Sequence, residues 1–364
     1  MTTNLYRLRQ SLKQRKIDAF LITSPENRRY LSGFSPLDGS LTESSGALLI
    51  PAEGSPYLLT DSRFKLEAEK EAQDFQLIVY SRGFLSSLKK LLKLYGISRL
   101  AVEGKSLLHS TFLKMNREFA GLGTEILPLE GVVENMRLCK SAGELQKIRE
   151  AIRLNEIVFQ EVYRQIKPGM TEIEIALRLE QTMRLKGAEG AAFTTIVAGG
   201  PGGASPHALP SRRPLQEGEP IIIDMGLILN GYCSDMSRTI ILGSAAQQTV
   251  KRFRLVRKAQ KAAINAVRAG VSARDVDSAA RELIAEEGMG DKFCHGLGHG
   301  VGLAVHEAPF LNRRNRKKLR DGMVVTVEPG IYIEGWGGIR LENMVVVRPE
   351  GCEELNQDST FLDL

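Results

Sequence analysis

The sequence predicts an α+β protein of two domains: an α/β domain over residues 1–130 and an internally duplicated α+β domain over residues 131–364. Three observations support this fold class. A chain of 364 residues is too long for one small hydrophobic core. Short β runs and helical stretches alternate up to about residue 128, which is typical of an α/β domain. Beyond that point, one plan of a long helix, a second helix with an N-terminal capping residue, and strands with acidic residues occurs twice.

The elements of the first domain follow from this alternation. Strands are expected at Ala19–Thr23, Ala47–Ile50, Tyr57–Thr60, Gln76–Tyr80 and Leu100–Glu103. Helices are expected at Leu5–Arg15, Arg63–Ala72, Leu85–Leu94 and Ser110–Phe119. His109 is the only histidine of this stretch, and we interpret it as a surface residue. The first domain therefore contributes few candidate catalytic side chains.

Capping residues mark the helices of the second domain. A capping box at Ser141 and Glu144 opens a helix that runs to about residue 167, and a second box at Thr171 opens a helix that ends near Gly187. Helices from about residue 247 to 268 and from 272 to 288 repeat the plan. The residues Gly169, Thr171, Glu174 and Gly187 recur as Gly270, Ser272, Asp275 and Gly288, at a constant offset of 101. We expect pseudo-twofold symmetry, with a site between the two halves.

Composition and charge exclude several classes of protein. Hydrophobic residues make up 43% and charged residues 25%, as in ordinary soluble domains. No apolar run approaches the roughly 20 residues of a membrane span, and the charged N-terminus lacks the apolar core of a signal peptide. The four cysteines are widely separated and are interpreted as reduced thiols. These features predict a cytoplasmic protein without membrane contact.

Basic residues concentrate at 251–261 and 313–320, within a modest net charge of +6. Neither run contains interleaved aromatic residues or a recognisable nucleic-acid motif. We interpret them as a solvated helix face and a surface loop, so no nucleic-acid partner is expected.

The segment Pro220–Ile241 (PIIIDMGLILNGYCSDMSRTII) carries the strongest chemical signal. Two apolar runs flank Asn230-Gly231, a pair that favours a two-residue β-hairpin turn. That register places Asp224 opposite Ser237 and Asp235 opposite Gly226. The two aspartates then share one face at roughly 5–8 Å, close enough to hold one or two cations. Gly226 is expected to leave room for a close ligand beside Asp235.

A solvent-facing hairpin with two ordinary acids is the alternative interpretation of this segment. The apolar residues on both sides of each aspartate favour a buried hairpin instead. Buried acids need partners, and a metal ion would supply one.

Three histidines lie within twelve residues of a glycine-rich stretch, CHGLGHGVGLAVHE, at His295, His299 and His306. The alternating glycines make a regular helix unfavourable and let the main chain approach a ligand. A loop with hydrogen-bonded imidazoles is the alternative interpretation. Two later apolar runs, Met323–Glu328 and Ile339–Val347, carry Glu328 and Glu342, with Arg340 and Glu342 expected on one face of the second run. We expect Arg340 to orient Glu342.

Four carboxylates and one imidazole suit two divalent ions, because bridging carboxylates offset the repulsion between two cations. Oxygen-rich coordination favours Mn²⁺ over a structural zinc site, which would have more Cys and His ligands. Two such ions can hold a hydroxide and stabilise the tetrahedral intermediate of amide hydrolysis.

The motifs DMGLILNGYCSD, HGLGHGVGLAVHE, TVEPGIY and GIRLEN resemble the metal-binding motifs of the Xaa-Pro peptidases, prolidase and aminopeptidase P, which have the pita-bread metallopeptidase fold. The stretch TSPENRRYLSGF at residues 23–34 resembles the creatinase-like N-terminal domain of that family. The resemblance covers the whole chain and implies a creatinase-like domain followed by a pita-bread catalytic domain.

Carried over motif by motif, the resemblance implies a ligand set and substrate-side histidines. Asp224 would bind one metal, His299 and Glu328 the other, and Asp235 and Glu342 would bridge both. His207 would lie on the substrate side, and His295 and His306 would flank the substrate and stabilise the intermediate. Glu328 would also act as general base. Ser237 and Leu227 depart from the usual Thr and Ala of the family, and neither is expected to touch a ligand.

The implied function is a dinuclear peptidase, with Mn²⁺ favoured and Co²⁺ or Zn²⁺ as alternatives, in which a metal-bridging hydroxide cleaves the N-terminal Xaa-Pro bond of peptides. The expected partners are peptides with proline at position two and, as the assembly, a homodimer. A strict Xaa-Pro dipeptidase is the alternative. A metal-free creatinase-like enzyme and a non-catalytic peptide-binding relative are disfavoured because all five ligands are present. The N-terminal domain argues against a methionine aminopeptidase.

Overall fold

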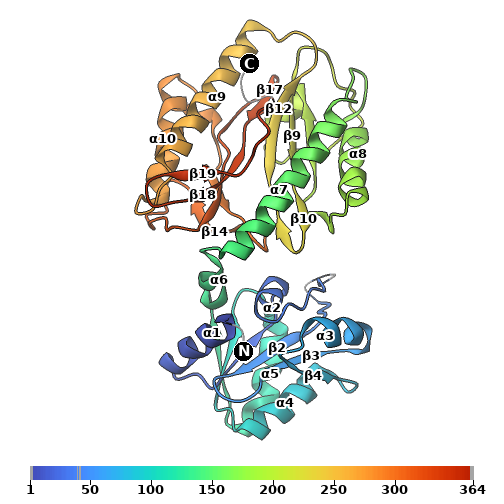
Figure 1. Cartoon of the computed structure of the whole chain (residues 1–364), viewed down its shortest axis with the longest axis vertical. Coiled ribbons are helices and arrows are strands. Elements are labelled where there is room, and N and C mark those ends of the chain that lie inside the picture. The colour runs from blue at the N-terminus through green and yellow to red at the C-terminus, as the bar shows by residue number, and fades with distance from the viewer. Residues whose placement is uncertain (1–2, 39, 41, 361–364) are drawn as a thin grey trace. The chain divides into compact units, whose positions relative to one another are not determined.

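The structure, a computed structural model, describes residues 3–38, 40 and 42–360 (Figure 1). The chain forms two compact units, Met1–Arg137 and Leu138–Leu364. Helix α6 (Val132–Arg137) groups with the first unit, and the predicted domain limits, 1–130 and 131–364, stay a prediction. No helix of the described residues is long and apolar enough to cross a lipid bilayer.

A six-stranded sheet forms the centre of the first unit, in the order β4-β3-β2-β1-β5-β6. Its strands are β1 (Ala19–Ile22), β2 (Ala47–Pro51), β3 (Tyr57–Thr60), β4 (Gln76–Val79), β5 (Arg99–Glu103) and β6 (Glu125–Leu129). Strand β2 is antiparallel to both neighbours, and the other pairs are parallel. Strands β1, β2 and β3 are buried along their whole length, which explains their continuous apolar runs. The prediction of these strands is confirmed, except that β6 was missed.

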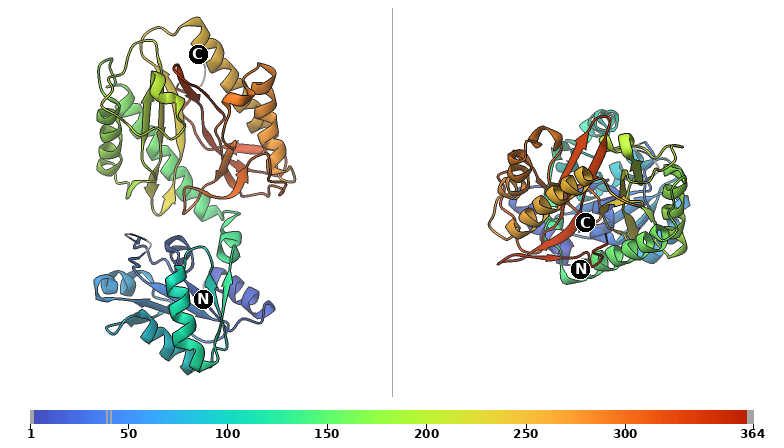
Figure 2. Two further views of the ribbon diagram at one scale, coloured as in Figure 1. Left: turned by 180° about the vertical axis from the view of Figure 1, so that it is seen from behind. Right: turned by 90° about the horizontal axis from the view of Figure 1, so that it is seen from above.

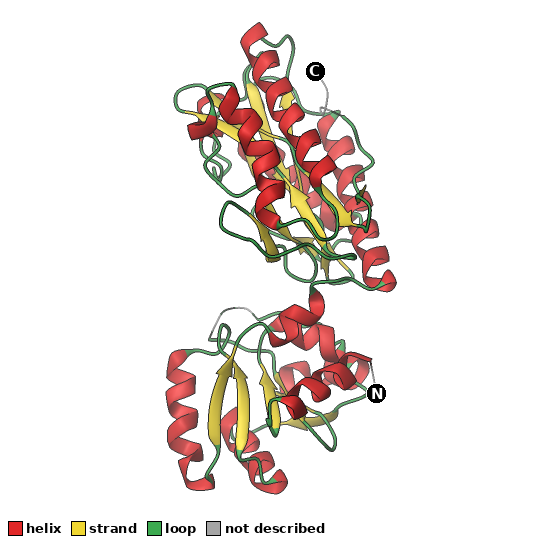
Figure 3. Ribbon diagram, turned by 90° about the vertical axis from the view of Figure 1, so that its left-hand side faces the viewer, coloured by secondary structure: helices red, strands yellow, loops and turns green. Residues whose placement is uncertain are grey.

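Helices cover both faces of this sheet (Figure 3). They are α1 (Thr3–Gln14), α2 (Pro25–Ser32), α3 (Lys65–Glu71), α4 (Phe84–Tyr95), α5 (His109–Phe119) and α6. Helices α1, α2, α3 and α6 share one hydrophobic cluster, and α4 and α5 share the other. Helix α2 was not predicted, although Ser24 caps it and Pro25 occupies its first turn. His109 is exposed, as predicted.

The second unit contains four long helices and a set of short sheets. The helices are α7 (Ala142–Tyr163), α8 (Glu172–Leu185), α9 (Gln247–Ala266) and α10 (Ala273–Glu286). The strands of its first half are β7 (Gly190–Ala191), β8 (Ile196–Gly199), β9 (Pro220–Met225), β10 (Leu227–Leu229), β11 (Tyr232–Cys233) and β12 (Met236–Ile241). Those of its second half are β13 (Gly298–Gly300), β14 (Glu307–Leu311), β15 (Val324–Val327), β16 (Gly330–Ile333), β17 (Gly337–Arg340), β18 (Asn343–Val347) and β19 (Cys352–Glu354). Figure 2 shows these strands between the helices.

Matching main-chain contacts confirm the internal duplication. In the first half, the N–H of Gly169 donates to the carbonyl of Leu215 at 2.9 Å. In the second half, the N–H of Gly270 donates to the carbonyl of Leu319, also at 2.9 Å. Isolated β-bridges join Thr171 to Pro214 and Ser272 to Lys318 in the same way. Each half therefore anchors the start of its second helix to the loop that precedes its acidic strands.

The acid-bearing strands are interrupted where the acids lie. The predicted strand Ile339–Val347 is wrong as one strand, because β17 pairs with β16 and β18 pairs with β15, with Leu341 and Glu342 between them. Strands β9 and β10 are likewise separated at Gly226. These breaks let the chain change sheets beside the carboxylates, which a pattern of alternating residues does not reveal.

Loss of an N-cap hydrogen bond in either half should destabilise the protein by a similar amount. The side chains of Thr171 and Ser272 accept hydrogen bonds from Glu174 N and Asp275 N, respectively. We predict that Thr171→Ala and Ser272→Ala each lower the free energy of unfolding by about 1 kcal/mol, measured by urea denaturation. The control Thr182→Ala, inside α8, should change it by less than about 0.5 kcal/mol. Equal effects of all three substitutions would contradict the capping roles.

Candidate metal centre

A cavity of about 460 Å³ in the second unit brings the predicted site residues together. Its lining includes Asp224, Asp235, Glu328, Glu342, His207, His295, His299 and His306. Four cavities of about 1000, 690, 650 and 630 Å³ are larger, but among the described residues His295, beside the 650 Å³ cavity, is the one histidine that lines any of them. The chemistry therefore concentrates in the smaller cavity.

The hairpin that carries the aspartates has the predicted register. Asn230 and Gly231 both have positive φ, 51° and 80°, as a two-residue hairpin turn requires. Leu229 lies opposite Tyr232. On β9 and β12, Asp224 lies opposite Ser237, as predicted. Asp235 follows β11 and is 4% exposed, so the interpretation as a solvent-facing hairpin is wrong.

Gly226 has a different role from the one predicted. A Cβ atom on Gly226 would collide with the carbonyl oxygen of Ser234 and with the ring of Phe193. The Oγ of Ser234 also accepts a hydrogen bond from Leu227 N at 3.0 Å. Gly226 therefore permits close packing of the hairpin against Phe193, and it does not leave a space for a ligand.

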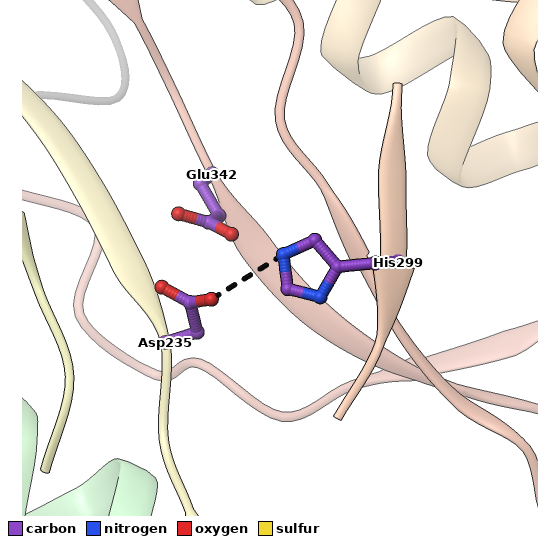
Figure 4. Close-up of side chains that lie close together, drawn as sticks. All are labelled: Asp235, His299 and Glu342. Atoms are coloured by element: carbon purple, nitrogen blue, oxygen red, sulfur yellow. Dashed lines mark ion pairs between the residues drawn. The ribbon is translucent and has the colours of Figure 1, made fainter. Parts of the chain in front are cut away.

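Asp235, His299 and Glu342 line the cavity and lie close together (Figure 4). Each offers one ligand atom, and these atoms lie within 4.8 Å of one another. His299 Nε2 lies 3.6 Å from Asp235 Oδ2 and 3.4 Å from Glu328 Oε1. His299 Nδ1 is 3.1 Å from the carbonyl of Gly300, which can only accept, so Nδ1 carries the proton. The bare Nε2 and two carboxylate oxygens then face one another, an arrangement that fits a cation between them.

The electrostatics of the cluster also require positive charge. Burial raises the pKa of Asp235 and of Glu328 well above the usual range, and the charge of Glu342 raises both further. Burial and the charge of Asp224 raise the pKa of Glu342 to about 8. Asp224 Oδ1 and Glu342 Oε1 are buried without a hydrogen-bond donor among the described residues. Divalent cations would satisfy these oxygens, so the donor set fits a metal centre.

Arg340 is a buried cation that holds one of these acids. Its Nη2 donates to Asp224 Oδ2 at 2.6 Å, and its Nε donates to Ser237 Oγ at 2.8 Å. The expected link from Arg340 to Glu342 therefore runs through Ser237, while the direct partner of the guanidinium is Asp224. Ser237 Oγ donates to Glu342 Oε2 at 3.0 Å, so the expectation that Ser237 touches no proposed ligand is wrong. Leu227 lies in the apolar core, away from these oxygens.

The four histidines of the second unit differ in their surroundings. Burial lowers the pKa of His295 and of His299 to about 4, so both rings are neutral at neutral pH. His306 is exposed, and its ring packs edge-on against His299, with centroids 4.3 Å apart. His207 is exposed at the edge of the cavity. His306 and His207 are therefore the more accessible to a substrate.

Sequence reasoning missed Tyr332, which links two parts of the site. Tyr332 Oη lies 2.9 Å from His295 Nε2 and accepts a hydrogen bond from Arg340 Nη1 at 2.8 Å. Its position in the motif TVEPGIY was the available signal. Phe193 and Phe310 also line the cavity, and no pattern in the sequence distinguished them from core or surface residues.

Comparison with known proteins identifies the family. The profile of metallopeptidase family M24 matches residues 146–349, and that of the creatinase/prolidase N-terminal domain matches residues 4–139. An Xaa-Pro dipeptidase of Pyrococcus horikoshii is 33% identical over 357 residues, which is 98% of this chain and 97% of that protein.

Solved structures agree with this assignment. An Xaa-Pro dipeptidase from Bacillus anthracis has a TM-score of 0.91 at 34% identity, covering 98% of this chain and 97% of that one. An X-Pro aminopeptidase from Thermotoga maritima has a TM-score of 0.86 at 39% identity, covering 96% and 98%. The chain therefore belongs to metallopeptidase family M24 and has the creatinase-like N-terminal domain and pita-bread domain expected from its motifs.

Proposed function

We propose that this protein is a dinuclear, metal-dependent peptidase that hydrolyses the N-terminal Xaa-Pro bond of peptides, in the manner of aminopeptidase P. The observation that carries the proposal is the meeting of all five predicted ligands in one cavity with three histidines beside them. Similarity to both an Xaa-Pro dipeptidase and an X-Pro aminopeptidase supports the class of bond. A strict Xaa-Pro dipeptidase is the second candidate, favoured by the relatives that carry this name.

Membership of family M24 implies divalent metal ions. We infer that Asp224 binds one ion, His299 and Glu328 bind the other, and Asp235 and Glu342 bridge the two. The unsatisfied oxygens of Asp224 and Glu342 and the bare Nε2 of His299 support this assignment. The ions, when bound, would polarise the scissile carbonyl and supply an activated water.

The protein's own groups would handle the protons and the substrate. Glu328, which accepts a hydrogen bond from Thr326 Oγ1 at 3.3 Å, would take a proton from the attacking water and pass it to the proline nitrogen. His306 would donate a hydrogen bond to the developing oxyanion. His295 would flank the substrate, and His207 would contact it at the cavity edge. The free α-amine of the substrate would bind at Asp224, whose buried Oδ1 needs a donor.

The surroundings of Arg340 favour peptides longer than two residues. A strict dipeptidase must bind the carboxylate of the proline, and Arg340 is the only arginine or lysine among the described residues that line the cavity. Its guanidinium is already bonded to Asp224, Ser237 and Tyr332. The cavity edge instead carries Leu209, 72% exposed, and Phe310, 47% exposed, which suit apolar contact with a longer peptide.

The metal, the compartment and the assembly belong to the same proposal. We infer Mn²⁺ as the native metal, because four of the five proposed ligands are carboxylates. The four free cysteines suit a reducing compartment, in line with a cytoplasmic protein. The homodimer is inferred from the resemblance to Xaa-Pro peptidases alone.

Substrate cleavage tests the proposed function directly. We predict that Ala-Pro and Ala-Pro-Ala are cleaved, whereas N-acetyl-Ala-Pro-Ala and Ala-Ala-Ala are not, measured by chromatography of the products. Acetylation removes the amine that Asp224 would accept, at a cost of about 1–3 kcal/mol or more. Hydrolysis of Ala-Pro with Ala-Pro-Ala left intact would make the protein a strict dipeptidase.

Paired histidine variants separate a ligand from a substrate contact. We predict that His299→Ala loses metal and activity together, because it removes a proposed ligand. His306→Ala should retain the metal and lower kcat, by about 100-fold or more, as expected for a donor to the oxyanion. Metal analysis by mass spectrometry and steady-state kinetics provide the readouts. The reverse pattern of metal content would exchange the two roles.

Removal of the metals should make stability depend on pH. In the metal-free protein, the raised pKa values of Asp235, Glu328 and Glu342 mean that the folded state binds more protons than the unfolded state. Stability should therefore fall as pH rises through the folded pKa of about 8 for Glu342. Burial lowers the pKa of His295, His299 and His306 in the folded state, so these rings are neutral from about pH 7.5 to about pH 9 and do not contribute there.

The measurement is the Tm of chelator-treated protein across this range, with loss of peptidase activity as the check of metal removal. Tm should fall with rising pH, and the slope should be shallower in Glu342→Gln, which cannot ionise. A constant or rising Tm of the metal-free protein would contradict the assignment of these acids to one repulsive cluster.

A further inference from the structure

A buried ion pair on α10 does not line the cavity and takes no part in the proposed chemistry. Asp277 is fully buried, and the side chain of Arg281, one turn later, is 11% exposed. Arg281 Nε and Nη2 donate to the two oxygens of Asp277 at 2.7 and 2.8 Å, a bidentate geometry. The cost of burying two charges requires further partners for both groups.

Those partners are main-chain groups of the segment that carries His295. Arg281 Nη1 donates to the carbonyl of Phe293 at 2.9 Å, and Nη2 donates to that of His295 at 2.7 Å. Asp277 Oδ1 accepts from Leu297 N at 3.1 Å. The guanidinium also lies over the Phe293 ring, 4.0 Å from its centroid. Three main-chain groups of residues 293–297 are therefore held by one ion pair.

The held segment leads directly into the site. His295 Nδ1 is 2.7 Å from the carbonyl of Gly296, which can only accept, so Nδ1 carries the proton and Nε2 accepts from Tyr332 Oη. Tyr332 in turn accepts from Arg340, which holds Asp224. The Phe293 ring packs edge-on against the His295 ring at 5.1 Å. A shift of the main chain at His295 would therefore reach a proposed metal ligand through two hydrogen-bonded side chains.

Core packing alone does not explain the pair. Helix α10 already buries Val276, Ala280 and Ile284 completely in the apolar core. Replacing a buried ion pair by apolar or neutral residues is often without cost to stability, so such a pair is weak evidence for a stabilising role. An apolar pair, however, could not make the three hydrogen bonds to the main chain.

We propose that Asp277 and Arg281 are positioning residues for the active site: they fix the main chain at residues 293–297 and thereby the ring of His295 and the Tyr332–Arg340 link to Asp224. This inference rests on the proposed function, because it assigns the pair a purpose in that site. Neither residue touches the substrate.

A double-mutant cycle tests the proposal. The variant Asp277→Asn with Arg281→Met removes both charges together, which avoids an unpaired buried charge. In the metal-loaded wild-type background, it should lower kcat/KM for Ala-Pro-Ala by about 10- to 100-fold, because displacement of an active-site group by about 1 Å has effects of that size. In a His295→Ala background, the same change should alter kcat/KM by less than about twofold, since no ring remains to be positioned.

Two controls separate positioning from a structural role. Arg213→Met with Glu219→Gln removes another bidentate ion pair, at 2.8 and 2.5 Å, on the first half of the unit, and should leave kcat/KM unchanged. The variant Arg281→Lys keeps the positive charge but loses the bidentate guanidinium. Compared with the double variant, it should recover more of the protein's stability than of its kcat/KM. In ¹⁵N-histidine-labelled protein, the NMR resonances of the His295 ring nitrogens should shift in the double variant. They should stay unchanged in the Arg213→Met, Glu219→Gln control.

Equal losses of kcat/KM in the wild-type and His295→Ala backgrounds would overturn the positioning role and leave the proposed function intact. Unchanged ring resonances of His295 in the double variant would overturn it as well. A wild-type protein that cleaves no Xaa-Pro peptide would refute the proposed function, and the resonances would then decide the positioning role alone.

Discussion

Concentrated negative charge inside a buried cavity is the constraint on which the second unit depends. Asp235, Glu328 and Glu342 all have raised pKa values because burial and neighbouring carboxylates oppose ionisation. Arg340 compensates part of this charge at Asp224, yet buried oxygens of Asp224 and Glu342 still lack donors. Such a cluster is a poor core and a good binding site for divalent cations, as family M24 requires. The surrounding strands are therefore organised to keep like charges together.

The internal duplication supplies this arrangement in two matched parts. The hairpin of the first half contributes Asp224 and Asp235, and the β15–β18 pair of the second half contributes Glu328 and Glu342. A polar residue of the long helix in each half holds the adjacent main chain. Asn155 Nδ2 donates to the carbonyl of Met225 at 3.1 Å, and Gln260 Nε2 donates to that of Val327 at 3.4 Å. Each acidic strand is thus fixed to its own helix beside the carboxylate that it presents.

The same local geometry serves His295 and His299 for different purposes. In both, Nδ1 donates to the carbonyl of the glycine that follows, which leaves Nε2 as an acceptor pointing away from the main chain. At His299 that nitrogen faces Asp235 and Glu328, whereas at His295 it accepts from Tyr332. The partner across the cavity, rather than the histidine itself, therefore separates a proposed ligand from a residue of the hydrogen-bonded network.

The sequence alone determined the features that depend on neighbours along the chain. Asn230 and Gly231 favour positive φ, and this turn fixed the pairing of Asp224 with Ser237. Capping residues located three of the four long helices, because caps satisfy the end groups of a helix within a few residues. Tertiary structure decided what joins distant strands: that Arg340 holds Asp224, that Tyr332 reaches His295, and that Gly226 makes room for Phe193. These contacts depend on where the chain leaves one sheet for another, at Gly226 and at Leu341–Glu342, and a residue pattern with a period of two carries no record of such breaks.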